Sequence, residues 1–150
     1  MLKVRSCFCE IINTILCGAK TIPEVRITKY ATELQNRLWD QLKFPVILYG
    51  HKQVEMIVAV YGLMQLEVPY IPADVIYPKE RVESIKQISK TNLVINCSDE
   101  TLDFEQVSIL SFRENKLELV QESEMLFEAQ KPADPLVYLI FTSGSTGEPK

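Results

Sequence analysis

The sequence predicts an α/β fold, part of a doubly wound and largely parallel sheet with flanking helices. Short, continuous apolar runs at 46–49, 93–96 and 136–141 are typical of strands that are buried on both faces of a parallel sheet. Between the first two runs, apolar residues recur with helical period over 52–66 and again after Pro78. Strands that alternate with helices favour right-handed crossovers and a largely parallel sheet. A chain of 150 residues, 47% of them hydrophobic, suits one globular domain.

Two helices are expected before the first strand. The first covers 6–16, because its apolar residues have the i, i+3, i+4, i+7 spacing of one helix face. The second covers 28–42, with Thr28 as its N-cap and with Pro45 blocking its continuation. The apolar residues of the two faces are, in chain order, Phe8, Ile11, Ile12, Ile15 and Ala19, and then Ala31, Leu34, Leu38 and Leu42.

The elements after the first strand follow from the same patterns. The helix over 52–66 leads into a short extended piece at 69–72. Pro78 lies near the start of the next helix, because the missing N–H of proline would be unpaired in a first turn anyway, and the residues that face inward are Val82, Ile85 and Ile88. The segments expected beyond it are strand 93–96, an irregular polar stretch at 97–104, strands 107–110 and 117–120, a polar connection at 122–135 and the last strand, 136–141.

The charge pattern argues against a nucleic-acid partner. The net charge is −4, the pI is about 5.1, and no basic run occurs. If the ligand carries phosphate, a local loop must attract it, because the field of the whole molecule does not.

The cysteines indicate neither a disulfide framework nor a zinc site. No C-x-x-C pair occurs, and His51 is the single histidine. We therefore expect a cytoplasmic protein in which the four cysteines are reduced thiols; they are Cys7, Cys9, Cys17 and Cys97.

The amino-terminal stretch has a superficial likeness to an export signal. Lys3 and Arg5 precede apolar residues, but Glu10 and Asn13 interrupt them and no A-x-A cleavage pattern follows. No stretch approaches the length that spans a bilayer, so no membrane insertion is expected.

A Ser/Thr/Gly-rich loop directly follows the last expected strand. In parallel α/β sheets, ligands bind beyond the carboxyl ends of the strands. The glycines permit positive φ, so that backbone N–H groups converge on an oxyanion, while hydroxyls add donors and a lysine adds a positive charge. The predicted phosphate-binding residues are Thr142, Ser143, Gly144, Ser145, Thr146, Gly147 and Lys150.

The spacing within this loop excludes the two commonest nucleotide motifs. A P-loop needs G-x-x-x-x-G-K-[ST], but counting from Gly144 the glycine position holds Pro149, and no Ser or Thr follows Lys150. The G-x-G-x-x-G fingerprint of dinucleotide-binding folds is also absent. By composition alone the segment also fits a flexible polar tail, and the preceding apolar run is what favours a ligand loop.

The stretch Tyr138-Leu139-Ile140-Phe141-Thr142-Ser143-Gly144-Ser145-Thr146-Gly147-Glu148-Pro149-Lys150 resembles the signature loop of the adenylate-forming superfamily. This superfamily includes acyl-CoA synthetases, luciferases and the adenylation domains of peptide synthetases. The resemblance implies that the loop holds the β- and γ-phosphates of ATP. It also implies that residues 1–150 are an incomplete N-terminal subdomain of an adenylation domain whose C-terminal remainder is absent.

A second region resembles one subfamily, the D-alanine–D-alanyl carrier protein ligases. The similar blocks run over 48–57, 70–74 and 78–82, and Tyr49-Gly50-His51 is the feature that favours this subfamily over peptide-synthetase domains. Where the subfamily usually has Lys-Ala-Gly, this chain has Gln65-Leu66-Glu67. We expect a glutamate to fit this tight turn only if its backbone avoids positive φ.

The resemblance implies a ligase that uses ATP and Mg²⁺ to activate D-alanine as D-alanyl-AMP. It then transfers D-alanine to the thiol of a carrier protein for teichoic acid D-alanylation. We assign no catalytic residue and no metal ligand within the chain, and we expect the chain alone to be inactive. Two alternatives stay open: a peptide-synthetase adenylation domain for another amino acid, or a non-catalytic product of a split or broken gene that binds a complementary C-terminal chain.

Three residues outside the loop are weaker candidates. His51 follows a strand, but no base partner is identifiable from the sequence, so we expect a structural hydrogen bond. Glu55 and Asp74 are a conceivable acid/base pair, but we expect a solvated helix residue and a turn former, respectively.

Overall fold

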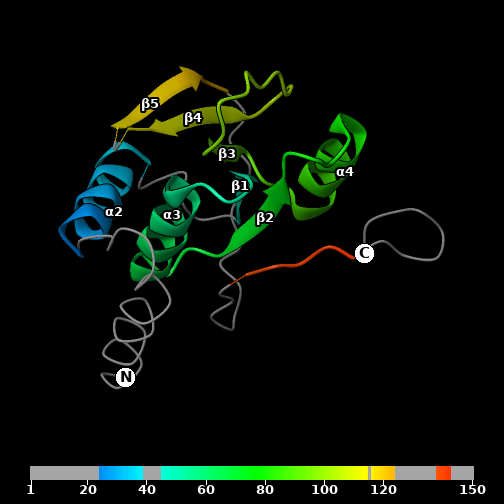
Figure 1. Ribbon diagram of the computed structural model, residues 1–150. Helices are drawn as coiled ribbons and strands as arrows, with labels where there is room; N and C mark the ends of the chain where they lie inside the picture. Colours follow the sequence, from blue (N-terminus) through cyan, green and yellow to red (C-terminus); the bar gives the residue numbers. More distant parts are fainter. Residues whose placement is uncertain (1–23, 39–44, 115, 124–137, 143–150) are drawn as a thin grey trace.

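The computed structural model describes residues 24–38, 45–114, 116–123 and 138–142, which form one sheet with helices on both faces (Figure 1). The strand order is β2-β1-β3-β4-β5; β1 to β4 run parallel, and β5 pairs antiparallel with β4. The predicted α/β class and largely parallel sheet are therefore confirmed. The elements are α2 (Glu24–Leu38), β1 (Val46–Gly50), α3 (Val54–Gln65), β2 (Tyr70–Asp74), α4 (Lys79–Ser89), β3 (Leu93–Asn96), β4 (Ser108–Arg113) and β5 (Lys116–Gln121).

The core lies on both faces of the sheet, because successive side chains of a strand point to opposite sides. In β1, Val46 and Leu48 face the cluster that includes the buried residues of α2 and α3. Ile47 and Tyr49 face the opposite cluster, to which α4 contributes. All five residues of β1 are buried, as the continuous apolar run predicted.

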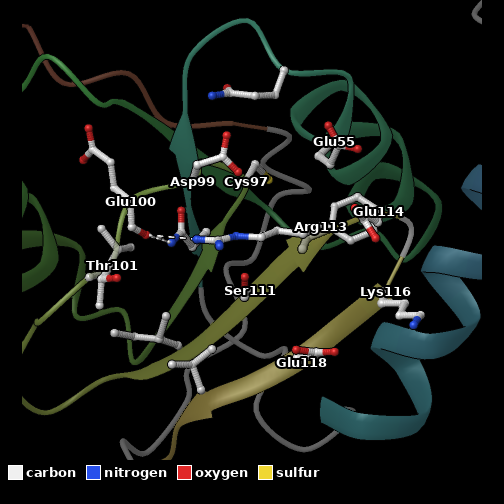
Figure 2. A pocket seen from close by; sticks show the side chains of 16 residues that line it. Glu55, Cys97, Asp99, Glu100, Thr101, Ser111, Arg113, Glu114, Lys116 and Glu118 are labelled. Carbon is white, nitrogen blue, oxygen red and sulfur yellow. Dashed lines mark hydrogen bonds between the residues drawn. The ribbon is translucent and has the colours of Figure 1, made fainter.

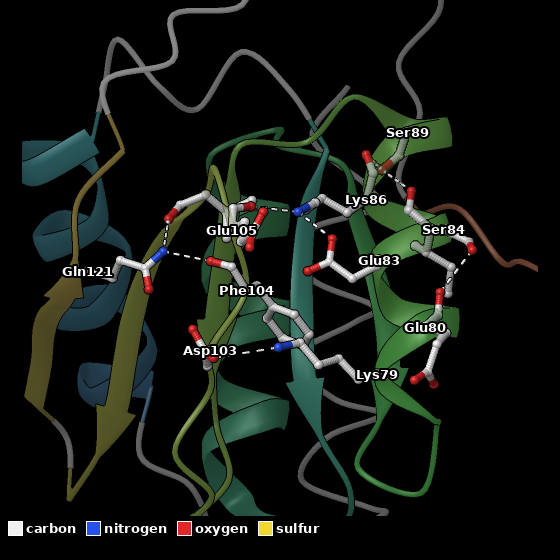
Figure 3. A network of polar contacts seen from close by, with 12 residues as sticks. Lys79, Glu80, Glu83, Ser84, Lys86, Ser89, Asp103, Phe104, Glu105 and Gln121 are labelled. Atoms are coloured by element: carbon white, nitrogen blue, oxygen red, sulfur yellow. Dashed lines mark hydrogen bonds and ion pairs between the residues drawn. The ribbon is translucent and has the colours of Figure 1, made fainter.

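Polar contacts tie α4 to the segment between β3 and β4 (Figure 3). The Lys86 ammonium pairs with Glu83 and donates a hydrogen bond to the Glu105 carbonyl at 2.6 Å. On the other side of the same segment, the Gln121 amide of β5 donates to the Phe104 carbonyl at 2.7 Å. The irregular stretch after β3 is thus held between a helix and the last strand.

The second helix begins earlier than predicted. We expected Thr28 to cap it, but α2 starts at Glu24, and Thr28 lies inside the helix, where its carbonyl accepts a hydrogen bond from the Thr32 hydroxyl at 2.9 Å. Proline favours the start of a helix, so Pro23, just before Glu24 in the sequence, was the better signal. Ala31 and Leu34 are buried as expected, whereas the helix predicted over 6–16 and Leu42 lie outside the described residues.

The prediction that Ile88 faces the core is wrong, because its side chain is 54% exposed. Val82 and Ile85 are buried as expected. Each three-residue step falls about 60° short of a full turn of an α-helix, so the second step carries Ile88 off the packed face.

The strand predicted over 136–141 is also wrong for the residues that can be described. Tyr138 makes an isolated parallel bridge to Tyr70, residues 139–142 are not in a strand, and Ile140 is 63% exposed. The Leu139 N–H donates to the Tyr70 carbonyl at 2.9 Å. In a parallel ladder the next donor on this side of β2 would be residue 72, which is Pro72 and has no N–H. The ladder therefore stops after one bridge.

The expectation for Glu67 is overturned as well. Glu67 has a φ of 56°, which is the left-handed region. Its N–H donates to the Met64 carbonyl at 3.2 Å, and the Val68 N–H donates to the Leu63 carbonyl at 2.9 Å. These two bonds form the Schellman arrangement that satisfies the last carbonyls of α3, so the turn imposes the positive φ on whatever residue stands there.

We predict that Glu67→Gly raises the free energy of unfolding by about 0.5–1 kcal/mol. Glycine removes the cost of a side chain in the left-handed region, which exceeds the extra entropy of the unfolded chain. Urea unfolding measures the change, and Glu67→Ala is the control, because alanine keeps the Cβ. An equal gain from both variants would contradict the backbone explanation.

We predict that Gly62→Ala lowers the free energy of unfolding by about 1–2 kcal/mol. A Cβ at this position would lie 2.3 Å from Tyr30 Cδ1, in the ring that packs against Phe112 at a centroid distance of 4.3 Å. Overpacking costs about 1–3 kcal/mol, and the better helix propensity of alanine offsets only part of it. If urea unfolding shows that Gly62→Ala is more stable than the wild type, the helix propensity of alanine outweighs the overpacking against Tyr30.

Candidate functional site

The carboxyl edge of the parallel strands gathers the polar residues that follow them. Gly50 at the end of β1 is level with Asp74 at the end of β2, and Tyr49 is level with Asn96 at the end of β3. His51 follows directly after β1. Ligands of open α/β sheets bind at this edge, so these side chains lie at the expected place for a site.

His51 and Asp74 form a pair across the ends of β1 and β2. The His51 Nδ1 lies 2.8 Å from Asp74 Oδ2, and the Ile76 N–H donates to Asp74 Oδ1 at 3.1 Å. The Asp74 side chain is 28% exposed. Its desolvation favours the neutral acid, but the hydrogen bonds from His51 and from the Ile76 N–H outweigh that effect, so the pKa of Asp74 is lowered. The carboxylate is thus held charged beside the imidazole.

This pair supplies the partner for His51 that the sequence did not reveal. The turn-forming role predicted for Asp74 is present in its bond to the Ile76 N–H. Glu55, in contrast, lies in the first turn of α3 and lines a separate pocket, described below. The two partners of the His51–Asp74 pair are 23 positions apart in the chain, and only the register of β1 against β2 brings them together.

A second polar cluster fixes the loop after β3. The Asn96 side chain donates to the Glu100 carbonyl at 2.7 Å and accepts from the Ser98 N–H at 2.9 Å. From β4, the Arg113 guanidinium donates to the Ser98 carbonyl at 3.2 Å and to the Glu100 carbonyl at 3.3 Å (Figure 2). These bonds hold the Glu100 backbone in place at the edge of the sheet.

Tyr49 connects this loop to the core. Its hydroxyl donates to Glu100 Oε2 at 3.0 Å, and its ring packs edge-on against Phe104. Burial, followed by the bond to Glu100, raises the pKa of Tyr49 to about 12, so the phenol stays protonated near neutral pH.

A pocket of about 650 Å³ opens between the start of α3, the loop after β3 and the β4–β5 hairpin (Figure 2). Its carboxylates outnumber its cations, which are Arg113 and Lys116; the acidic residues are Glu55, Asp99, Glu100, Glu114 and Glu118. Burial, and then the charge of Glu55, raises the pKa of the Cys97 thiol in its wall to about 12. A protonated thiol is a poor nucleophile, and a wall of carboxylates repels polyphosphate, so this pocket is a poor nucleotide site.

The predicted phosphate loop begins at the same edge of the sheet as the His51–Asp74 pair. The segment that leads into it pairs with β2 at Tyr70, and its Leu139 and Phe141 pack against the core cluster on the α4 side. Thr142, the first residue of the loop, is exposed. The other predicted phosphate-binding residues lie outside the described residues and stay predictions: Ser143, Gly144, Ser145, Thr146, Gly147 and Lys150.

Neither a metal site nor a membrane span was found among the described residues. No group of three or more His, Cys, Asp and Glu side chains in that part of the chain could hold a metal ion. Within the same residues, no helix has the length and apolar character that crossing a membrane requires.

An open, largely parallel sheet with helices on both faces is a framework that many nucleotide-binding α/β proteins share, with the ligand at the carboxyl edge of the strands. A comparison with family models then gives the family. The AMP-binding enzyme family matches residues 23–150, and the chain belongs to this family of adenylate-forming ligases.

Curated relatives of this family share a name. The chain is 38% identical over 127 residues to the D-alanine–D-alanyl carrier protein ligase of Staphylococcus epidermidis. The aligned region covers 83% of this chain and 25% of that protein. It is 32% identical over 154 residues to the ligase of the same name from Staphylococcus aureus, and this aligned region covers 94% of the chain and 31% of that protein. The chain thus spans between a quarter and a third of these relatives.

Solved structures support the same fold. CmiS6 matches with a TM-score of 0.68 at 23% identity, over 85% of this chain and 30% of that one. A malonyl-CoA ligase with methylmalonyl-CoA and AMP bound matches with a TM-score of 0.63 at 19% identity, over 89% of this chain and 27% of that one. At these identities the likeness concerns the fold alone.

We predict that Asp74→Asn lowers the free energy of unfolding at neutral pH by a fraction of a kcal/mol, since the pair is partly exposed. Folding lowers the pKa of Asp74, so the contribution of its charge to stability is present above the ordinary value of 3.8 and is lost as the pH falls through the folded-state pKa. Urea unfolding of the wild type and the variant at pH 7 and at pH 3 measures the loss of stability and its dependence on pH.

Asp103→Asn is the matched control, because the Asp103 side chain is 91% exposed and lies 3.6 Å from Lys79. This control substitution should change the free energy of unfolding little at either pH. A pH-independent loss for Asp74→Asn would show that the side chain acts through shape and not through its charge.

Proposed function

We propose that this chain is the N-terminal, ATP-binding part of a ligase that activates D-alanine and delivers it to a carrier protein for teichoic acid D-alanylation. The observation that carries the proposal is the signature sequence at 142–150, which follows a segment that pairs with the edge strand β2 through one bridge, from Tyr138 to Tyr70. The names of the relatives that are 32–38% identical to the chain support D-alanine as the substrate and a carrier protein as the partner.

In the proposed reaction, a carboxylate oxygen of D-alanine attacks the α-phosphorus of ATP. The bond from that phosphorus to the bridging oxygen breaks, and pyrophosphate leaves with the electron pair. A thiol of the carrier protein then attacks the carbonyl of D-alanyl-AMP, which forms a thioester and releases AMP. The first step takes place on a polyanion, so its main demand is for positioned donors and positive charge.

The residues of this chain meet that demand in the loop. The hydroxyls of Thr142 and of the serines and threonine that follow it donate hydrogen bonds to phosphate oxygens, and glycines let the backbone N–H groups do the same. Lys150 adds a positive charge. Mg²⁺ is proposed to neutralise the ATP phosphates, and no step is assigned to protein ligands of the ion.

Residues 1–150 are, in this proposal, the N-terminal subdomain of the ligase, which acts in the cytoplasm. The D-alanine pocket and the surface that receives the carrier protein belong to the portion of the relatives that the chain does not span. The chain by itself therefore binds ATP without completing the reaction.

We predict that the chain binds MgATP and that Lys150→Ala weakens this binding about tenfold, because a charge-assisted contact to phosphate is lost. Isothermal titration calorimetry measures the affinity. Lys116→Ala is the control, since Lys116 is an exposed lysine on the β4–β5 hairpin. Equal affinities for the wild type and both variants would overturn the assignment of the loop.

We predict that ATP–pyrophosphate exchange with D-alanine does not rise above the Lys150→Ala background. Exchange clearly above that background would show that the chain holds a complete amino-acid site. The wild-type chain and the variant are compared at the same protein concentration, with and without D-alanine.

A further inference from the structure

The entrance to the phosphate loop is held by a side chain from a distant helix. Arg81, in the first turns of α4, donates a hydrogen bond from its guanidinium Nη2 to the Phe141 carbonyl at 3.4 Å. Phe141 is the residue immediately before Thr142, where the predicted phosphate-binding residues begin. The two partners are 60 positions apart in the chain.

Backbone pairing does not hold this entrance. The segment donates from the Leu139 N–H to Tyr70 of β2, and Pro72 cannot continue the ladder, because it has no N–H. Had the ladder continued, the Asp74 N–H would have donated to the Phe141 carbonyl. Within the described residues, the one hydrogen bond that the structure gives to 140–142 comes from Arg81. A side chain thus takes the place of the missing ladder donor.

The arginine is itself held in a defined orientation. Its Cζ lies 4.3 Å from the centroid of the Tyr77 ring, within the range of a cation–π contact. Tyr77 and Phe141 both pack against the core cluster on the α4 side. The Arg81 Nε is buried and has no hydrogen-bond partner among the described residues. Stacking therefore fixes the plane of the guanidinium, and the bond to Phe141 uses only one of its donors.

We propose that Arg81 is a positioning residue for the phosphate loop: it fixes the Phe141 carbonyl, and through it the direction of the chain at Thr142, where the predicted phosphate-binding residues begin. The inference rests on the proposed function in one respect, namely that the loop binds ATP. Arg81 acts through the Phe141 backbone. Its effect on nucleotide affinity follows from the order that it gives to the start of the loop.

The test compares Arg81→Leu, Arg81→Lys and Lys79→Leu in the full chain. Leucine removes the donor, and lysine keeps a donor and the charge but loses the planar fork that stacks on Tyr77. Lys79 is the matched control on the same helix, since it is an exposed cation that pairs with Asp103. Two readouts are measured: MgATP affinity by titration calorimetry, and amide hydrogen exchange by NMR.

We expect Arg81→Leu to weaken MgATP binding about tenfold, Arg81→Lys to recover part of the loss, and Lys79→Leu to bind like the wild type. We expect exchange to accelerate in Arg81→Leu at the Leu139 amide, which donates to the Tyr70 carbonyl, while the amides of β3 keep their protection. Wild-type affinity in Arg81→Leu, or an equal loss in Lys79→Leu, would overturn the proposal. If Arg81→Leu does not fold, the decision passes to Arg81→Lys, where unchanged affinity together with unchanged exchange at Leu139 would overturn it.

The outcomes also separate this inference from the proposed function. If the wild-type chain does not bind MgATP, the proposed function fails, and hydrogen exchange at Leu139 alone decides whether Arg81 anchors the segment. If the wild type binds and the Arg81 variants bind equally well, the function stands and the role of Arg81 is refuted.

Discussion

The burial of β1 on both faces is the constraint on which the rest of the structure depends. A strand with no exposed residue needs a packed layer on each side, and α2 with α3 on one face and α4 on the other supply them. It also needs neighbours on both edges, and β2 and β3 pair with it in parallel. Parallel pairing then brings the carboxyl ends of all three strands to one edge, so the location of the site follows from the packing of the core.

The elements that the sequence predicted well are those in which one local pattern decides the outcome. The apolar run of β1 and the helical period of α3 both lead directly to the observed structure. The predictions that failed depended on long-range geometry. Ile88 has the right spacing but lies beyond the packed face, and the 136–141 run is apolar enough for a strand but meets Pro72 on its neighbour. A residue such as Glu67 shows the same limit, because the turn, and not the side chain, sets its φ.

The candidate site was predictable to a similar extent. The loop at 142–150 was predicted from the apolar run before it and from its resemblance to a family signature, and its phosphate-binding role stays a prediction. The His51–Asp74 pair and the contact of Arg81 with Phe141 could not, because each joins segments that only the sheet register and helix packing bring together. Charge distinguishes two regions of the structure: the pocket beside Arg113 is rich in carboxylates, whereas the segment before the predicted loop has the Arg81 guanidinium beside it.

Pro72 has a consequence for solubility as well as for the loop. A β-strand at the margin of a sheet is a template onto which the strand of another molecule can add, and long regular margins of this kind promote aggregation. The outward side of β2 offers a carbonyl at Tyr70 that is already bonded to Leu139 and, two residues on, a position without a donor. A foreign strand would meet the same interruption that ends the pairing with residues 138–142. The proline that ends the pairing after Tyr138 thereby also hinders intermolecular strand addition along this margin.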